Sequence, residues 1–238
     1  MSFEFATATQ IVFGPGMIQR VPHAAARMGR RALLVTGQDA RRSTALNEAV
    51  TSAGLVCTVF HTGGEPSVPM AEKAVGQARQ DQVDLVIAIG GGSAIDLAKV
   101  VAAMLTNEGD LACYLEVVGQ GRPLAHRCVP WIAIPTTAGT GAEVTCNAVL
   151  GVPQHGRKVS IRSPLMLASL AVVDPELTYS LPPQVTASTG LDALTQLIEP
   201  FVSTAANPMT DGLCREGIMR VGRSLRRAYA DGRSAAAR

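Results

Sequence analysis

The chain has 238 residues and a formal net charge of +2, with 47% hydrophobic and 17% charged residues. This composition is typical of a globular protein with a sizeable core, and it excludes a disordered chain. So small a net charge gives no support for binding to nucleic acid or to an anionic membrane surface. We therefore expect a folded protein that binds neither nucleic acid nor a membrane surface.

The cysteines and the N-terminus bear on the compartment. The five cysteines lie outside metal-motif spacing and their number is odd, which is typical of free thiols in a reducing cytoplasm. The first ten residues lack the basic and apolar regions of a signal peptide. No apolar run reaches the length of a membrane span. A cytoplasmic protein without a membrane segment is expected.

Strand-like and helix-like segments alternate through the first two thirds of the chain. Strands are predicted over residues 31–35, 55–60, 83–89 and 131–134, and helices over residues 43–53, 70–82 and from the glycines at 90–92 to residue 105. This β-α-β rhythm predicts a parallel sheet with helices on both faces. Residues 85–89 are apolar without interruption, as expected for a strand that is buried on both faces.

The pattern changes after about residue 144. The remaining predicted elements are a hairpin over 148–161 with its turn at 153–156, a short strand over 170–173, and helices over 189–202 and 208–229. We therefore expect an α/β domain over residues 1–180, followed by a helical domain over residues 181–238.

Three glycines follow the strand predicted at 83–89 and open the next helix. Gly90, Gly91 and Gly92 allow the backbone to approach a ligand closely. Ser93 is expected to cap the helix, and Asp96 stands three residues later, at capping-box spacing. The free N–H groups and the positive end of the helix dipole favour a phosphate there. The alternative is a glycine turn that serves only close packing.

A second polar loop, residues 135–145, follows the strand predicted at 131–134. Thr136, Thr137 and Thr140 offer hydroxyl groups suited to a phosphate, a ribose or an amide. A loop whose threonines merely cap a helix explains the same residues. Two such loops at the C-terminal ends of parallel strands favour a nucleotide, because open α/β sheets bind ligands at that edge.

Asp192 and Gln196 are four residues apart and share one face of a predicted helix. An aspartate there can hold a divalent metal, whereas a glutamine offers only a neutral amide oxygen. The alternative is an acidic residue favoured by the helix dipole.

Five motifs together resemble one known family, the iron-containing (group III) alcohol dehydrogenases. They are Phe-Gly-Pro-Gly at 13–16, Ala-Ile-Gly-Gly-Gly-Ser at 88–93 with Asp96 and Lys99, residues 134–145, Asp-Pro-Glu-Leu at 174–177, and residues 187–195. The resemblance covers nearly the whole chain. It implies a Rossmann-like, parallel-sheet dinucleotide-binding domain followed by the start of an all-helical domain, an architecture shared with dehydroquinate synthase.

The resemblance also implies an activity: hydride transfer between an alcohol and the nicotinamide of NAD or NADP, with Fe²⁺ or Zn²⁺ polarising the alcohol oxygen. The substrate would be a small alcohol, aldehyde or ketone, and the protein would be a homodimer paired through residues 3–13. By resemblance, the cofactor-binding residues are Gly37, Asp39, Gly90, Gly91, Gly92, Ser93, Asp96, Thr136, Thr137, Thr140 and Lys158, and the metal position involves Asp192 and Gln196.

The chain departs from the family pattern at the metal. Gln196 stands where the family has a histidine, and no histidine follows His155. The metal site is therefore expected to be incomplete, and the chain is expected to stop within the helical domain, leaving apolar residues such as Ile198 and Leu213 exposed. Two alternatives stay open: a metal-independent enzyme similar to the maleylacetate reductases, and a nucleotide-binding remnant without catalysis.

A second departure concerns the coenzyme. Gly37 stands where NAD-preferring members often have an acidic residue for the ribose. It leaves room for a 2′-phosphate, which Arg41 or Arg42 would pair with, whereas Asp39 nearby can accept a ribose hydroxyl. NAD and NADP both remain open.

Overall fold

The computed structural model describes residues 2–37 and 40–238, with the side chains of residues 40–42 excepted. The described chain divides into two compact units. Unit 2 comprises Thr7–Pro135 and Ala142–Val173, and unit 1 comprises the remaining segments, Met1–Ala6, Thr136–Gly141 and Asp174–Arg238. No described helix is both long and apolar enough to cross a membrane.

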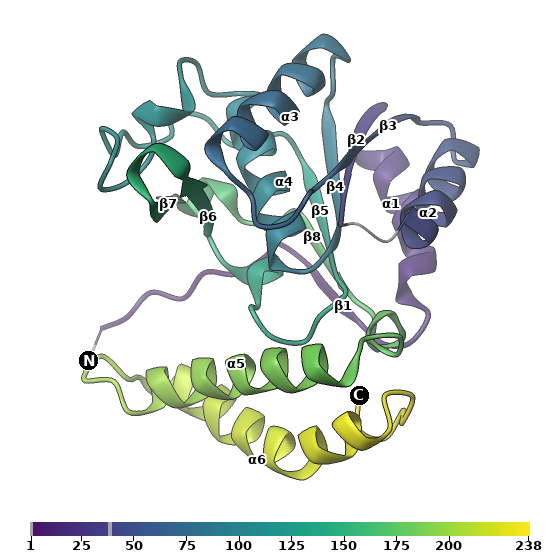
Figure 1. The fold of residues 1–238 in the computed structure, drawn as a ribbon, viewed down its shortest axis with the longest axis vertical. Helices are drawn as coiled ribbons and strands as arrows, with labels where there is room; N and C mark the ends of the chain where they lie inside the picture. Colours follow the sequence, from purple (N-terminus) through teal and green to yellow (C-terminus); the bar gives the residue numbers. More distant parts are fainter. Residues whose placement is uncertain (1, 38–39) are drawn as a thin grey trace. The chain divides into compact units, whose positions relative to one another are not determined.

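Unit 2 is built on a six-stranded parallel sheet in the order β1-β8-β5-β4-β2-β3. Its strands are β1 (Ile11–Phe13), β2 (Arg31–Thr36), β3 (Val56–His61), β4 (Leu85–Gly90), β5 (Trp131–Pro135) and β8 (Leu170–Val173). Its helices are α1 (Val21–Met28), α2 (Ala40–Ser52), α3 (Val68–Gln80) and α4 (Gly92–Met104). In Figure 1, α1 and α2 cover one face of this sheet, and α3 and α4 cover the other.

The direction in which the chain winds reverses at β2 and β4. From β2 the chain moves outward to the edge strand β3 and then returns to β4 on the other side of β2. The C-terminal ends of β2 and β4 therefore form the topological switch point of the sheet, where open α/β folds place their ligands.

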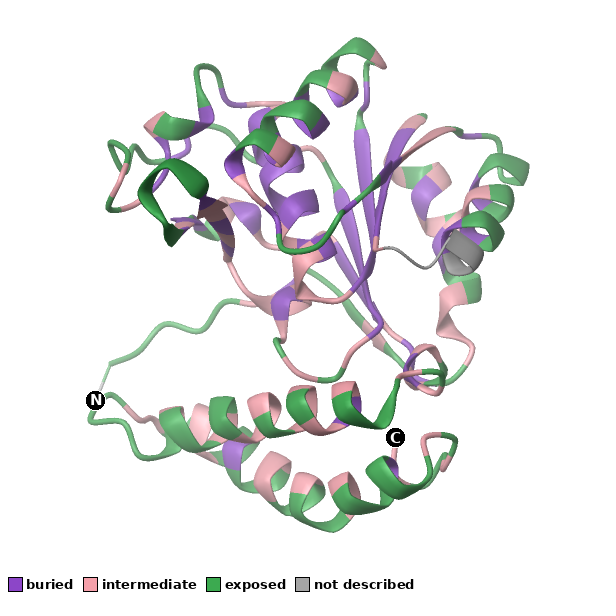
Figure 2. Ribbon diagram, in the orientation of Figure 1, coloured by how far each residue is buried: buried purple, intermediate pink, exposed green. Residues whose placement is uncertain are grey.

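The centre of the sheet is fully buried. Every residue of β4 is buried, as expected for a strand covered on both faces (Figure 2). Trp131, at the start of β5, is buried and donates its indole N–H to the carbonyl of Met166 at 3.1 Å. Helix α4 is buried along almost its whole length, including Lys99, whose side chain has no exposed surface.

A two-stranded antiparallel hairpin packs beside α4. It consists of β6 (Asn147–Val152) and β7 (Arg157–Arg162). A 3₁₀ turn at Pro153–His155 joins the strands, and Gly156 closes it in the left-handed conformation, with φ 58°. The hairpin and its turn were predicted from the sequence, and the structure confirms both.

Unit 1 contains two long helices, α5 (Pro183–Phe201) and α6 (Pro208–Ala230), which pack against each other. A Cβ atom added at Gly217 would lie 2.6 Å from a terminal methyl group of Leu197, so the leucine packs directly over this glycine. Asn207 caps α6 with a complete capping box. Ile198 and Leu213 are 43% and 57% exposed, as expected from the sequence, whereas Ile218 and Leu225, for which exposure was also expected, are half-buried.

The structure confirms the predicted fold class and corrects details of it. Helix α1 was not predicted, although Pro22 in its first turn is a typical signal of a helix start. Ser43 was expected to cap the second helix, but α2 already begins at Ala40 and Ser43 is buried inside it. The predicted domain boundary at residue 180 remains a prediction.

The five cysteines are all free thiols. Burial raises the pKa of Cys57 to about 11 and that of Cys128 to about 12. At pH 8, iodoacetamide should therefore modify Cys57 roughly 100-fold more slowly than an unperturbed thiol, and Cys128 more slowly still, because the thiolate is the nucleophile. Peptide mapping of the alkylated chain measures the rates. The same cysteines in the denatured chain are the control, and equal rates in the two states would contradict the prediction.

Candidate functional site

The glycine loop leaves the C-terminal end of β4. Gly90 is the last residue of the strand, Gly91 is the helix N-cap in an extended conformation (φ −76°, ψ −174°), and α4 begins at Gly92. No side chain caps this helix. The first N–H groups of a helix have no intrahelical acceptor, so the first turn of α4 offers them, with the positive end of the helix dipole, to an anion.

Ser93 does not have the predicted capping role. It lies inside the first turn of α4, one residue after the helix begins, and the cap position belongs to Gly91. The predicted capping box of Ser93 and Asp96 is therefore wrong. The glycines allow the helix to start earlier than a serine cap would, and no side chain makes a capping hydrogen bond to its first turn.

Gly90 and Gly37 meet at the switch point. A Cβ atom added at Gly90 would lie 2.7 Å from the Cβ of Ala94 and 3.4 Å from the backbone nitrogen of Gly37. Gly90 is thus required for packing, which was the alternative interpretation of the glycines. Among the described residues, nothing lies within 4 Å of a Cβ built at Gly37. Asp39, the other predicted residue here, lies outside the described residues.

The threonine loop follows the neighbouring strand. Pro135, the last residue of β5, pairs with Gly90 across the sheet, so Thr136 directly follows a residue that lies beside the glycine loop. Thr136 is buried, Thr137 is half-buried and Thr140 is exposed. The predicted loop therefore leaves the same edge of the sheet as the glycine loop. Whether the hydroxyls bind a cofactor remains a prediction.

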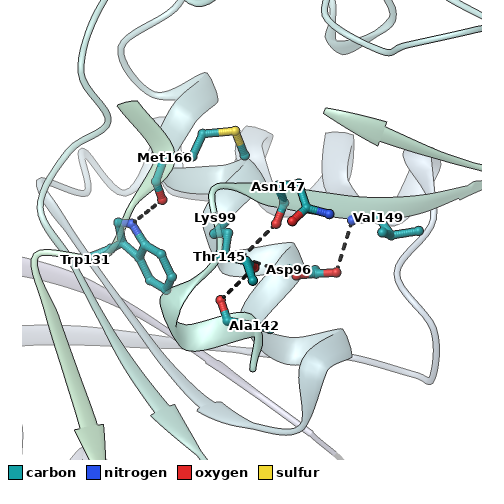
Figure 3. Close-up of polar contacts among 8 residues, drawn as sticks. All are labelled: Asp96, Lys99, Trp131, Ala142, Thr145, Asn147, Val149 and Met166. Carbon is teal, nitrogen blue, oxygen red and sulfur yellow. Dashed lines mark hydrogen bonds and ion pairs between the residues drawn. The ribbon is translucent and has the colours of Figure 1, made fainter. Parts of the chain in front are cut away.

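The carboxylate of Asp96 faces protein groups. Its Oδ2 accepts a hydrogen bond from the backbone N–H of Val149 at 3.0 Å, and its Oδ1 lies 3.7 Å from Lys99 Nζ (Figure 3). Burial raises the pKa of this carboxyl group, although Lys99 and the Val149 N–H oppose the shift. The structure gives Asp96 partners on the hairpin and on its own helix, and the cofactor contact predicted from the sequence remains a prediction.

Lys158 lies on β7 of the same hairpin. Its Nζ forms an ion pair with Glu65 Oε1 at 2.6 Å, and the side chains are 62% and 68% exposed, respectively. An ion pair this exposed contributes little to stability. Its predicted role near the ribose and nicotinamide remains a prediction.

Asp192 and Gln196 meet on α5, as their spacing predicted. Gln196 Nε2 donates to Asp192 Oδ2 at 3.0 Å and to the carbonyl of Gly139 at 3.4 Å. The pair offers one carboxylate and one neutral amide whose N–H group already faces the carboxylate. The described residues contain no group of three or more His, Cys, Asp and Glu side chains arranged for a metal ion. Asp192 and Gln196 alone do not fit the Fe²⁺ or Zn²⁺ of the predicted site.

A histidine at position 196 tests this conclusion. Gln196→His would place an imidazole one helical turn from Asp192, but two ligands do not hold Fe²⁺ or Zn²⁺ against dialysis. We expect metal analysis of the dialysed variant to find no more metal than in the unsubstituted chain. Stoichiometric retention of either ion by the 238-residue variant would show that further ligands exist in this chain.

Comparisons with known protein families agree with the motifs. Residues 8–175 match the family model described as iron-containing alcohol dehydrogenase, and residues 186–238 match the model of the family's C-terminal region. The chain belongs to the iron-containing alcohol dehydrogenase family. This confirms the resemblance and the predicted α/β Rossmann-like domain followed by a helical region.

Individual family members are similar along almost the whole chain. Long-chain-alcohol dehydrogenase 1 of Geobacillus thermodenitrificans is 40% identical over 98% of this chain and 61% of its own length. 4-Hydroxybutyrate dehydrogenase of Cupriavidus necator is 38% identical over 97% of this chain and 61% of its own length. The chain thus spans about three fifths of the length of these two relatives.

A solved structure of the family carries a coenzyme. Sulfoacetaldehyde reductase from Bifidobacterium kashiwanohense, in complex with NAD⁺, superposes with a TM-score of 0.91 and 35% identity, covering 98% of this chain and 62% of its own. This likeness confirms the fold of the present chain as that of an iron-containing alcohol dehydrogenase over nearly all its residues.

The sequence analysis missed the partners of Lys99. This lysine donates hydrogen bonds to Thr145 Oγ1 and to the carbonyl of Asn147, in a segment more than forty residues away. The available signal was a single lysine in the middle of the apolar run Leu97–Met104. A buried charge of this kind needs polar partners.

Proposed function

We propose that this chain binds NAD or NADP and serves hydride transfer between an alcohol and the corresponding aldehyde or ketone. The observation that carries the proposal is the place of the uncapped first turn of α4. It lies at the switch point of the parallel sheet, beside Gly37. A dinucleotide pyrophosphate suits such a helix terminus.

In the proposed site, the backbone N–H groups of Gly91, Gly92 and Ser93 hold the pyrophosphate. Thr136, Thr137 and Thr140 contact the phosphate and adenine side, and Lys158 contacts the ribose near the nicotinamide. When bound, the coenzyme would supply the redox chemistry of the reaction, which is hydride transfer to or from the alcohol carbon. No step is assigned to a metal, because Asp192 and Gln196 do not form a site for one.

Gly37 is the residue that bears most on the preference for NAD or NADP. A glycine leaves the space at the end of β2 open among the described residues, which suits a 2′-phosphate as well as a ribose hydroxyl. Coenzyme preference is therefore measured with both nucleotides.

An activity assay tests the proposed reaction. The purified chain is incubated with NADH or NADPH and a panel of aldehydes, with and without added Fe²⁺, and absorbance at about 340 nm is followed. We expect aldehyde-dependent oxidation of the coenzyme. Activity that is unaffected by a chelator would identify a metal-independent reductase, similar to the alternative raised by Gln196. Coenzyme binding without turnover would identify a nucleotide-binding protein and contradict the proposed reaction.

We also propose a homodimer in a reducing compartment such as the cytoplasm. The five free thiols support the compartment. Strand β1 is the edge of the parallel sheet, and its Ile11 and Phe13 are 48% and 69% exposed. An exposed apolar edge strand favours pairing with a second chain. A mass of twice 24.8 kDa in light scattering supports the dimer, and a mass of 24.8 kDa contradicts it.

A further inference from the structure

We propose that Asp96 and Lys99 are positioning residues of the coenzyme site. In this inference they fasten residues 145–149, which comprise the last residue of the threonine loop and the start of β6, to the helix whose first turn holds the coenzyme phosphates. The inference rests on the proposed function and assigns neither side chain a contact with the coenzyme. All of these residues belong to unit 2.

The ammonium group of Lys99 faces three acceptors. It donates to Thr145 Oγ1 at 2.9 Å and to the carbonyl of Asn147 at 2.7 Å, and it lies 3.7 Å from Asp96 Oδ1 (Figure 3). An ammonium has three N–H donors and no acceptor; two of these donors make hydrogen bonds here, and the Asp96 carboxylate supplies a counter-charge. Thr145 and Asn147 stand on either side of the start of β6.

Asp96 adds a second tie to the same strand. Its Oδ2 accepts from the N–H of Val149 at 3.0 Å, while Oδ1 faces Lys99. Asp96 and Lys99 are three residues apart and lie on one face of α4. Together they bind three groups of residues 145–149: the Thr145 hydroxyl, the Asn147 carbonyl and the Val149 N–H. A hydrophobic pair in their place would fill the volume without fixing the register of this segment against the helix.

The two ends of the threonine loop are thereby linked to one helix and its strand. Before the loop, Pro135 pairs with Gly90, which leads directly into α4. After the loop, Thr145 is bonded to Lys99, seven residues along that helix from Gly92. At 1.5 Å per residue this separation is about 10 Å along the helix axis. A rigid helix thus sets the spacing between the phosphate-binding turn and the end of the threonine loop.

The cluster is buried and contains other ionisable groups. Asp96, Cys146 and Glu143 all face Lys99 and favour its charged form, while burial, the larger effect, lowers the pKa of Lys99. Burial likewise raises the pKa of Glu143. Removing only the lysine leaves Asp96 without its counter-charge, so single substitutions risk a stability loss that is unrelated to positioning. The test therefore needs a variant that leaves the ion pair intact.

Thr145→Val is that variant. It removes the hydroxyl that accepts from Lys99 and leaves Asp96, Lys99 and the side-chain volume in place. Lys99→Met combined with Asp96→Asn removes both charges together. Lys73→Met, an exposed lysine on α3, is the matched control. Each variant is titrated with NADH and, in competition, with inorganic pyrophosphate, at a temperature where its unfolding curve shows a fully folded chain.

We expect Thr145→Val and the double variant to raise the dissociation constant for NADH about tenfold, because small misplacements of binding groups are costly. Pyrophosphate, which needs only the turn at the start of α4, should bind within about twofold of the unsubstituted chain. The control should match the unsubstituted chain with both ligands.

Unchanged NADH binding by folded Thr145→Val would overturn the inference. Equal losses of NADH and pyrophosphate would also overturn it, because they would indicate general damage. If the double variant does not fold, NADH binding by Thr145→Val alone tests the inference. Failure of the unsubstituted chain to bind either NADH or NADPH is a separate result, which would refute the proposed function itself.

Discussion

Replacing Gly91 with valine is expected to raise the dissociation constant for NADH at least about 100-fold while the chain stays folded. The loss corresponds to two hydrogen bonds from backbone N–H groups to a charged phosphate, each worth about 1.5–3 kcal/mol. In the proposed site a branched side chain at the N-cap of α4 would occupy the place of the pyrophosphate. This is the largest functional effect that the proposed site predicts for a single substitution.

The backbone at Gly91 makes the experiment interpretable. Its φ of −76° and ψ of −174° are values that any residue adopts, so valine introduces no left-handed strain at this position. Thermal unfolding checks that the variant remains folded. Gly76→Val is the control, because a Cβ at this helical glycine meets nothing within 4 Å. A folded Gly91→Val chain that binds NADH normally would contradict the assignment of the glycine loop.

Replacing Asn107 with alanine should lower the free energy of unfolding by about 3–5 kcal/mol. Asn107 is 2% exposed. Its Oδ1 accepts from the N–H groups of Ala125 and His126 at 2.9 and 3.0 Å, and its Nδ2 donates to the carbonyls of Ala103 and His126 at 2.9 and 3.0 Å. Alanine would leave several of these backbone groups without a partner.

Urea denaturation measures the loss, and two variants refine it. Asn107→Asp keeps an acceptor for the two N–H groups but turns a second oxygen toward two carbonyls, so it should also be destabilising. Thr106→Ala removes a hydroxyl that donates to the Ala103 carbonyl and accepts from Asn107 Nδ2, and it should cost less than about 1 kcal/mol. If Asn107→Ala and Thr106→Ala were equally stable, the hydrogen bonds of the Asn107 side chain would not stabilise the fold as predicted.

Local patterns predicted the elements that depend on local signals. The apolar strand before the glycines, the hairpin around Gly156 and the helix after Asn207 each carry their signal within about ten residues, and the structure confirms them. Helix starts were less predictable. Ser43 and Ser93 are good capping residues, but both helices begin before them, and at α4 the N-cap position is occupied by Gly91.

In the candidate site, too, the sequence predicted some features and not others. The positions of the glycine and threonine loops followed from strand order, because parallel strands bring their C-terminal ends to one edge. The partners of Asp96 and Lys99 could not be predicted from the sequence. They are Thr145, Asn147 and Val149, which lie some fifty residues away and contact α4 because the hairpin packs beside it. From its local sequence Asp96 was predicted to take part in a capping box. In the structure its carboxylate instead accepts a hydrogen bond from the Val149 N–H.

Fluorescence titration of the purified chain with NADH and, separately, with NADPH tests the central claim most directly. The account predicts saturable binding of at least one of them by the folded chain, and the tighter ligand establishes what Gly37 permits at the ribose. A folded chain that binds neither nucleotide would contradict the assignment of a dinucleotide site to the switch point of the sheet.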